Sequence, residues 1–149
     1  MRWRILAVVA ILGGGSMPAL AGLYTDDLSR CLVEGTTSAD RITLVRWISA
    51  AILQHPAVSA LSKATPDDVE NANVAVGALF MKLLTDTCKE KAAKAIKYEG
   101  VLAIQGAFFV LGQVATTDLF ADASVQKVMA GLEKHVDSKK LESLVGSAP

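Results

Sequence analysis

The stretch TPDDVENANVAVGALFMKLLTDTCKEK, residues 65–91, decides the fold class of this chain. Thr65 is a suitable N-cap, Pro66 suits the first position of a helix, and acidic residues follow in the first turn. The apolar residues that come next recur at helical spacing: Val69, Ala72, Val76, Leu79, Phe80, Leu83 and Leu84. Cys88 continues this stripe, so the pattern predicts a long helix that carries a cysteine on its buried face.

The chain on either side of this stretch also has helical periodicity, and no segment alternates as a strand between hairpin turns would. The predicted helices cover, in order, residues 26–34, 38–55, 66–88, 89–98, 101–116, 124–136 and 138–146. Thr25 is the predicted N-cap of the first helix, and Thr37 with Asp40 forms a capping-box pattern at the second.

Residues 101–115, VLAIQGAFFVLGQVA, contain no charged residue. The segment is shorter than the roughly 20 residues that span a bilayer, so we expect a helix that is apolar on nearly all sides and surrounded by the others. The fold prediction is therefore all-α, a single compact bundle of about six helices around a central apolar helix at residues 101–116, with one disulfide. In the next helix Val125, Val128, Met129 and Leu132 are expected to face inward.

The first residues, MRWRILAVVAILGGGSMPALAG, have the order of a secretory signal peptide: a basic start, an apolar core, and small residues at an A-x-A cleavage signature. The apolar run from Ile5 to Leu12 is too short for a transmembrane anchor. We therefore predict a signal peptide over residues 1–21, cleavage after Ala21, and a single helical domain over residues 22–149 that is periplasmic or secreted. No transmembrane anchor is expected after cleavage.

The charge balance argues against nucleic acid as a partner. The chain has 15 basic and 15 acidic residues, and loss of Arg2 and Arg4 with the signal peptide leaves the mature domain slightly acidic. A protein that binds nucleic acid needs a basic face to neutralise phosphates. We therefore expect a protein partner or an apolar ligand, with the oligomeric state open.

Cys31 and Cys88 are the two cysteines of the chain. Leu28, Cys31 and Leu32 share one face of the first helix, so Cys31 is expected to point inward as Cys88 does. In an oxidising compartment two cysteines of a small domain usually pair. On the chain-entropy model a Cys31–Cys88 bridge would stabilise the domain by roughly 4 kcal/mol. A thiol nucleophile or a metal ligand is the alternative interpretation of Cys88.

Patterns for catalysis and metal binding are weak. His55 and His135 lie near helix ends and outside any recognisable catalytic sequence, and the zinc spacings C-x-x-C and H-E-x-x-H are absent from the sequence. We therefore predict no catalytic residues, no metal and no cofactor. The competing hypothesis is an enzyme whose site is assembled from His55, Arg46 and Asp40.

The candidate site is instead apolar. Phe108 and Phe109 lie in the uncharged helix, part of which could line a groove for an apolar ligand or a client segment, although the same residues would also suit a core. Met81 and Met129 have flexible side chains that suit an adaptable surface. The predicted function is a non-enzymatic, chaperone-like binding protein of the periplasm. The alternative is a structural or partner-specific interaction protein, as a homodimer or an inhibitor of an envelope enzyme.

Three stretches, SRCLVEGTTSADRITLVRWI, GALFMKLLTDTCKEK and LFADASVQKVMAGLEKHVD, resemble a group of small, uncharacterised exported proteins of Gram-negative bacteria. The resemblance covers most of residues 22–149 and implies a periplasmic helical protein, without an activity or functional residues. The chain is more loosely similar to the periplasmic acid-stress chaperones, in which one disulfide ties a small helical protein and the second cysteine precedes a lysine-rich segment. That likeness carries over only to Cys31 and Cys88.

Overall fold

The computed structural model describes residues 22–146, and the predicted signal peptide lies outside them. No strand occurs in this range, so the all-α prediction is confirmed. The α-helices are α1 (Leu23–Gly35), α2 (Ser38–Ile52), α3 (Pro66–Lys82), α4 (Lys89–Glu99), α5 (Leu102–Ala121), α6 (Ala123–Ala130) and α7 (Ser138–Gly146). Shorter turns lie between them: the 3-10 helices η1 (Ser59–Leu61) and η3 (Gly131–His135), and the π-helix η2 (Leu83–Thr87).

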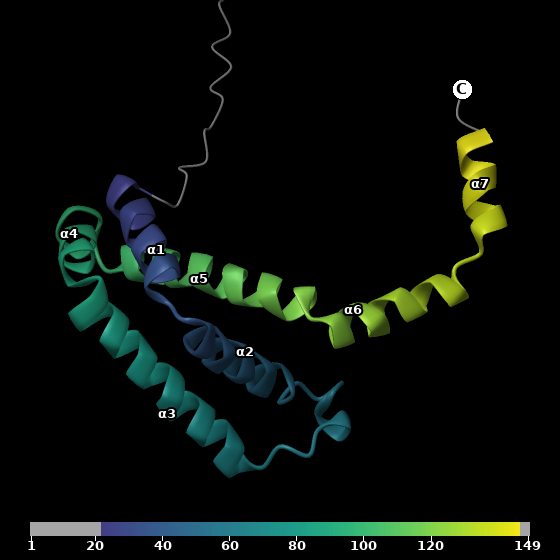
Figure 1. The fold of residues 1–149 in the computed structure, drawn as a ribbon, viewed down its shortest axis with the longest axis horizontal. Helices are drawn as coiled ribbons and strands as arrows, with labels where there is room; N and C mark the ends of the chain where they lie inside the picture. Colours follow the sequence, from purple (N-terminus) through teal and green to yellow (C-terminus); the bar gives the residue numbers. More distant parts are fainter. Residues whose placement is uncertain (1–21, 147–149) are drawn as a thin grey trace, which may run out of the picture.

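Helices α1 to α5 form the bundle (Figure 1). Helix α5 contacts α1, α2 and α4, and α3 packs along α2. The core consists of Leu28, Leu32, Leu44, Val76, Leu79, Leu83, Cys88, Ala92, Ala95, Ala103, Ala107, Leu111 and Ala115. The members from α4 and α5 are almost all alanine, and their small side chains allow these helices to approach their neighbours closely.

Helix α5 is central, but only one of its faces is buried. Its buried residues, Ala103, Ala107, Leu111 and Ala115, recur at every fourth position. On another side Phe109 is 68% exposed. The expectation that other helices surround α5 is therefore wrong, because α1, α2 and α4 leave part of its circumference uncovered. At 20 residues, α5 is also longer than predicted, and by length and composition alone it meets the requirement for crossing a bilayer.

Residues 123–146 form an arm that extends away from the bundle (Figure 1). Helix α6 contacts only α5 and η3, and α7 packs against no other element that the structure describes. Val128, Met129 and Leu132 are exposed, so the expectation that they face inward is wrong. Helical spacing places such residues on one side of a helix, but it does not provide an element that covers that side.

Capping boxes begin both α2 and α3. The box at Thr37 was predicted, whereas at Thr65 the prediction was an N-cap. The side chains of Thr37 and Thr65 accept hydrogen bonds from the backbone N–H of Asp40 and Asp68, whose carboxylates accept hydrogen bonds in return. Helix α1 differs from the prediction, because it begins at Leu23 and contains Thr25 as a buried residue. The cap of α1 comes from a distant side chain, described below.

Replacing Thr65 with alanine should lower the free energy of unfolding by about 1 kcal/mol, because the first turn of α3 loses its side-chain acceptor. Urea denaturation followed by circular dichroism measures the change. Thr65→Ser is the matched control, since serine keeps the hydroxyl. Equal destabilisation by both variants would show that the cap does not stabilise α3.

Candidate functional site

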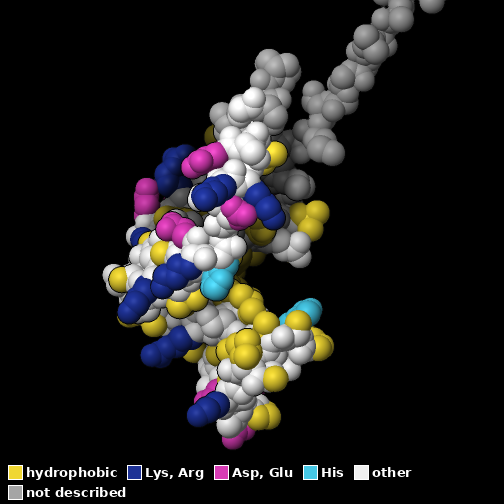
Figure 2. Space-filling view, turned by 90° about the vertical axis from the view of Figure 1, so that its right-hand side faces the viewer, with side chains coloured by type: hydrophobic (Ala, Val, Ile, Leu, Met, Phe, Trp, Pro, Cys, Tyr) yellow, Lys and Arg dark blue, Asp and Glu magenta, His cyan; other side chains and the backbone are white. Residues whose placement is uncertain are grey.

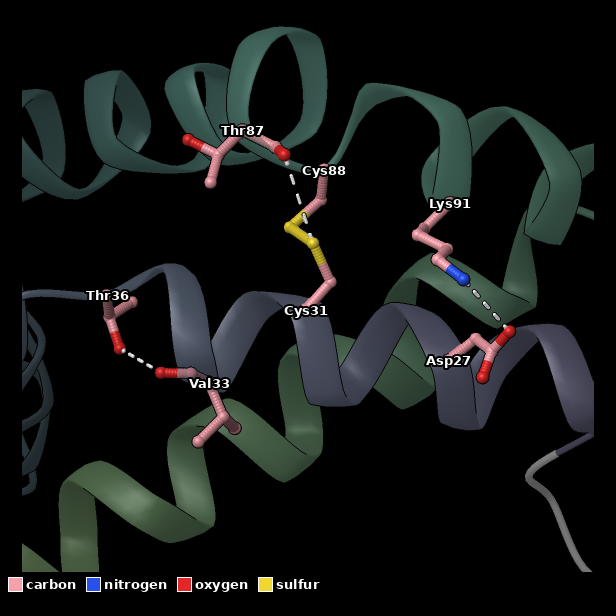
Figure 3. Close-up of a disulfide and its surroundings, with 7 residues drawn as sticks. All are labelled: Asp27, Cys31, Val33, Thr36, Thr87, Cys88 and Lys91. Carbon is pink, nitrogen blue, oxygen red and sulfur yellow. Dashed lines mark hydrogen bonds and ion pairs between the residues drawn. A yellow bond between two sulfur atoms is a disulfide. The ribbon is translucent and has the colours of Figure 1, made fainter.

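Cys31 and Cys88 form a disulfide that joins α1 to the end of η2 (Figure 3). The two residues are 57 positions apart in the sequence, and their Cα atoms lie 5.9 Å apart. Cys88 is 2% exposed, and Cys31 is partly buried against the core. The predicted pairing is confirmed, and with both sulfur atoms bonded the interpretation of Cys88 as a nucleophile or metal ligand does not apply to this state.

The π-helical turn η2 places Cys88 against α1. The backbone N–H of Cys88 donates to the carbonyl of Leu83 at 2.7 Å, five residues back rather than four. The Thr85 hydroxyl donates to the carbonyl of Met81 at 2.8 Å, in competition with the helical backbone bonds. The extra residue in the turn changes the direction in which later side chains point. Cys88, directly after the turn, is buried and bonded to Cys31 of α1, and this contact between η2 and α1 is the joint at which the apolar stripe of α3 ends.

Close packing and one ion pair support the joint (Figure 3). A Cβ atom added to Gly35 would lie only 2.8 Å from Cγ2 of Thr87, so α1 and η2 leave little room for a side chain there. Lys91 Nζ lies 3.2 Å from Asp27 Oδ2. This pair is partly exposed and contributes at most about 1 kcal/mol. The disulfide is therefore the main link between α1 and the turn that follows α3.

Glu99, the last residue of α4, caps the start of α1. Its carboxylate accepts hydrogen bonds from the backbone N–H groups of Tyr24 and Thr25, both at 2.8 Å, and from the Thr25 hydroxyl at 2.6 Å. The bond from the Thr25 hydroxyl is the largest cause that lowers the pKa of Glu99; desolvation opposes it and the two N–H groups reinforce it. The rings of Tyr24 and Tyr98 stack nearby, with centroids 4.7 Å apart.

Acid should weaken this cap in a defined direction. Folding lowers the pKa of Glu99, so its contribution is present above the pKa of the unfolded carboxyl and is lost as pH falls through the lower folded pKa. Glu99→Gln should remove this part of the decline in melting temperature between neutral and acidic pH. Asp40 and Asp68 also have lowered pKa values, so part of the decline should remain. Parallel curves for the variant and the parent protein would contradict the assignment.

The four apolar residues predicted for a groove do not come together. Phe108 packs against the core, with its ring centroid 4.0 Å from that of Phe80. Phe109 is exposed on α5, Met81 is exposed near the end of α3, and Met129 is exposed on α6. Helices α3 and α6 do not contact each other. Of the four, Phe109 lines a groove together with neighbours from α2.

That groove runs between α2 and α5 and has a volume of about 520 Å³. It is lined by Trp47, Ile48, Phe109, Gly112, Gln113, Thr116 and Thr117. The indole N–H of Trp47 donates to Asn73 at 3.0 Å, which ties the ring to α3. That α2 forms one wall of this groove was not predicted. The sequence signal for it was Trp47, which lies off the main apolar stripe of its helix. Seen along the arm, hydrophobic side chains gather across the middle and lower part of the molecule (Figure 2).

A second groove, of about 440 Å³, lies between α2 and the junction of α5 with α6. Its walls include the apolar side chains of Ile42 and Leu119. The guanidinium of Arg41 pairs with Asp118 at 3.2 Å across it, while Arg41 Nε is buried without a hydrogen-bond partner. The two grooves together give the α2–α5 side an accessible surface that is largely apolar.

The structure does not assemble the competing enzyme site. Asp40 lies at the start of α2, where it caps the helix and pairs with Lys82 at 3.7 Å. His55 lies beyond the other end of α2, exposed, and its Nδ1 accepts a hydrogen bond from the N–H of Ala57. The part of α2 that follows Asp40, residues 41–52, separates them, a rise of about 18 Å. Among residues 22–146 no group of three or more His, Cys, Asp or Glu side chains is placed to hold a metal ion.

Comparisons of the chain with protein-family models, with curated proteins and with solved structures found no match. Fold and site therefore define the class by themselves: a disulfide-linked, all-α domain with an exposed apolar surface between α2 and α5.

Proposed function

We propose that this chain is a non-enzymatic, chaperone-like binding protein of the periplasm that holds apolar segments of other proteins between α2 and α5. The observation that supports the proposal is the groove beside Phe109, in which an exposed phenylalanine faces solvent next to Trp47 and Ile48. Contiguous exposed apolar surface with aromatic side chains is typical of binding sites for apolar partners.

The periplasmic location is part of this proposal. The disulfide is compatible with an oxidising compartment outside the cytosol. Residues 1–21 have the order of a signal peptide. A single disulfide would let the domain keep its shape while its apolar surface exchanges partners.

Dye binding and client protection test the proposal. The protein should enhance the fluorescence of an apolar dye and suppress aggregation of unfolded client proteins at neutral or low pH. Phe109→Gln should reduce both effects severalfold. Leu61→Gln is the matched control, because Leu61 is 81% exposed on η1 and lies outside the groove. The proposal would be overturned if the protein neither bound the dye nor protected clients at neutral pH and at low pH alike. Equal losses of dye binding and client protection in Phe109→Gln and Leu61→Gln would also overturn it.

A specific protein–protein role is the second candidate, and the arm favours it. Helix α7 contacts no other described element, and exposed apolar residues such as Val128 and Leu132 continue along residues 123–146. Light scattering and affinity capture separate the two candidates. A stable dimer, or one stoichiometric partner lost on Leu132→Asp, would support the specific role, whereas many substoichiometric clients would support the chaperone-like role.

A further inference from the structure

The carboxylate of Glu99 lies against the residue that signal-peptide cleavage would expose. Gly22 is the N-cap of α1, and a Cβ atom added there would overlap the Glu99 carboxylate, with Oε2 at 2.7 Å. Only a residue without a side chain leaves room for the carboxylate in this position. Gly22 is also the residue that follows Ala21 in the A-x-A signature.

Glu99 has no cationic partner among the described residues. Its three hydrogen bonds come from two backbone N–H groups and one hydroxyl, all neutral. The charged group nearest along α4 is Lys97, which lies 5.1 Å from the centroid of the Tyr98 ring. The start of α1 offers the partial positive charge of a helix N-terminus and, in its first turn, the carboxylate of Asp26. A full positive charge beside Gly22 would therefore meet an unpaired carboxylate.

We propose that removal of the signal peptide creates this charge: the new α-ammonium group of Gly22 pairs with the Glu99 carboxylate and locks the start of α1 onto α4. The inference rests on the export that forms part of the proposed function. A leader-removing peptidase hydrolyses the Ala21–Gly22 bond with one water, whose hydroxyl goes to the carboxyl group of Ala21. The remaining hydrogen of the water goes to the nitrogen of Gly22. This nitrogen takes a further proton from solvent, because a free α-amino group has a pKa near 8.

The proposed ion pair between Gly22 and Glu99 links removal of the signal peptide to the stability of the domain. Before cleavage the Gly22 nitrogen is a neutral amide, so the ion pair cannot form. Helix α1 carries Cys31 and the buried residues Leu28 and Leu32, so fixing its first turn supports the joint that the disulfide closes. The exported chain should therefore be more stable than the same chain with a blocked N-terminus.

The α-amino pKa of the mature protein, residues 22–149, tests the proposal directly by NMR titration or by amine labelling at graded pH. The pKa should rise by about one unit above its ordinary value near 8, and Glu99→Gln should return it to that value. Gly22→Ala should make the rise smaller, since the Glu99 carboxylate must shift away from the added methyl group.

Stability provides the second readout. Acetylation of the Gly22 nitrogen should reduce the folding equilibrium constant about tenfold at neutral pH, which corresponds to one pKa unit. Because folding raises the amine pKa, the difference should be full below pH 8 and vanish as pH rises through the folded value. It should also vanish in Glu99→Gln. An amine that titrates normally, or equal effects of acetylation with and without Glu99, would overturn the proposal. Client protection should not depend on acetylation, so this outcome stays separate from that of the proposed function.

Discussion

Replacing both cysteines with alanine should lower the free energy of unfolding by about 4 kcal/mol. The Cys31–Cys88 bridge closes a loop across 57 residues, and without it the unfolded chain regains the conformational freedom that the bridge removes. Domains of this size are stabilised by only about 5–15 kcal/mol in total. The double variant should therefore unfold at much lower urea concentration, with a melting temperature reduced by many degrees.

Reduction of the parent protein provides the control for this experiment. Reduction breaks the same bond but leaves both sulfur atoms in place. If it lowers the free energy of unfolding less than the double variant does, the difference measures the packing of the Cys88 side chain, which is 2% exposed. Lys91→Ala removes the exposed ion pair at the same joint and should cost less than about 1 kcal/mol. If reduction left the urea midpoint unchanged, the bridge would not be the main link between α1 and η2.

Replacing Leu111 with alanine should cost about 3 kcal/mol. Leu111 is 1% exposed and belongs to the single buried face of α5, and deletion of a buried leucine side chain leaves a cavity that the backbone fills only in part. The variant should keep its helical circular dichroism at room temperature but unfold at a lower urea concentration.

Phe109→Ala is the matched control on the same helix. Phe109 is 68% exposed, so its removal should change the stability by well under 1 kcal/mol while it weakens dye binding. Together the two variants separate the core face of α5 from its binding face. Similar losses of stability in both would mean that α5 is surrounded by protein in solution.

Local signals in the sequence were enough to predict most of the bundle. The capping boxes at Thr37 and Thr65 and the stripe that ends at Cys88 depend on residues a few positions apart, so their physical causes are visible in the sequence. The disulfide followed because Cys31 and Cys88 lie on predicted inward faces. The cap of α1 was mispredicted, because Glu99 reaches it from 75 residues further along the chain.

The candidate site was less predictable for a similar reason. Apolar periodicity identifies which residues share a helix face, but not whether another helix covers that face. Phe108 and Phe109 are neighbours in sequence, yet one packs on Phe80 and the other borders a groove. Met129 was expected to face inward, and it is exposed because α6 leaves the bundle. The groove depends on how α2 crosses α5, and that crossing is set by long-range packing.

Intact-mass analysis of the protein recovered from the periplasm, alkylated without prior reduction, tests the central claim most directly. The proposed mature protein is an exported helical domain that begins at Gly22 and is closed by the Cys31–Cys88 disulfide. We expect the mass of residues 22–149 less two hydrogens, with no alkyl group attached. A protein that retains residues 1–21, begins at another residue, or carries alkylated cysteines would contradict this expectation.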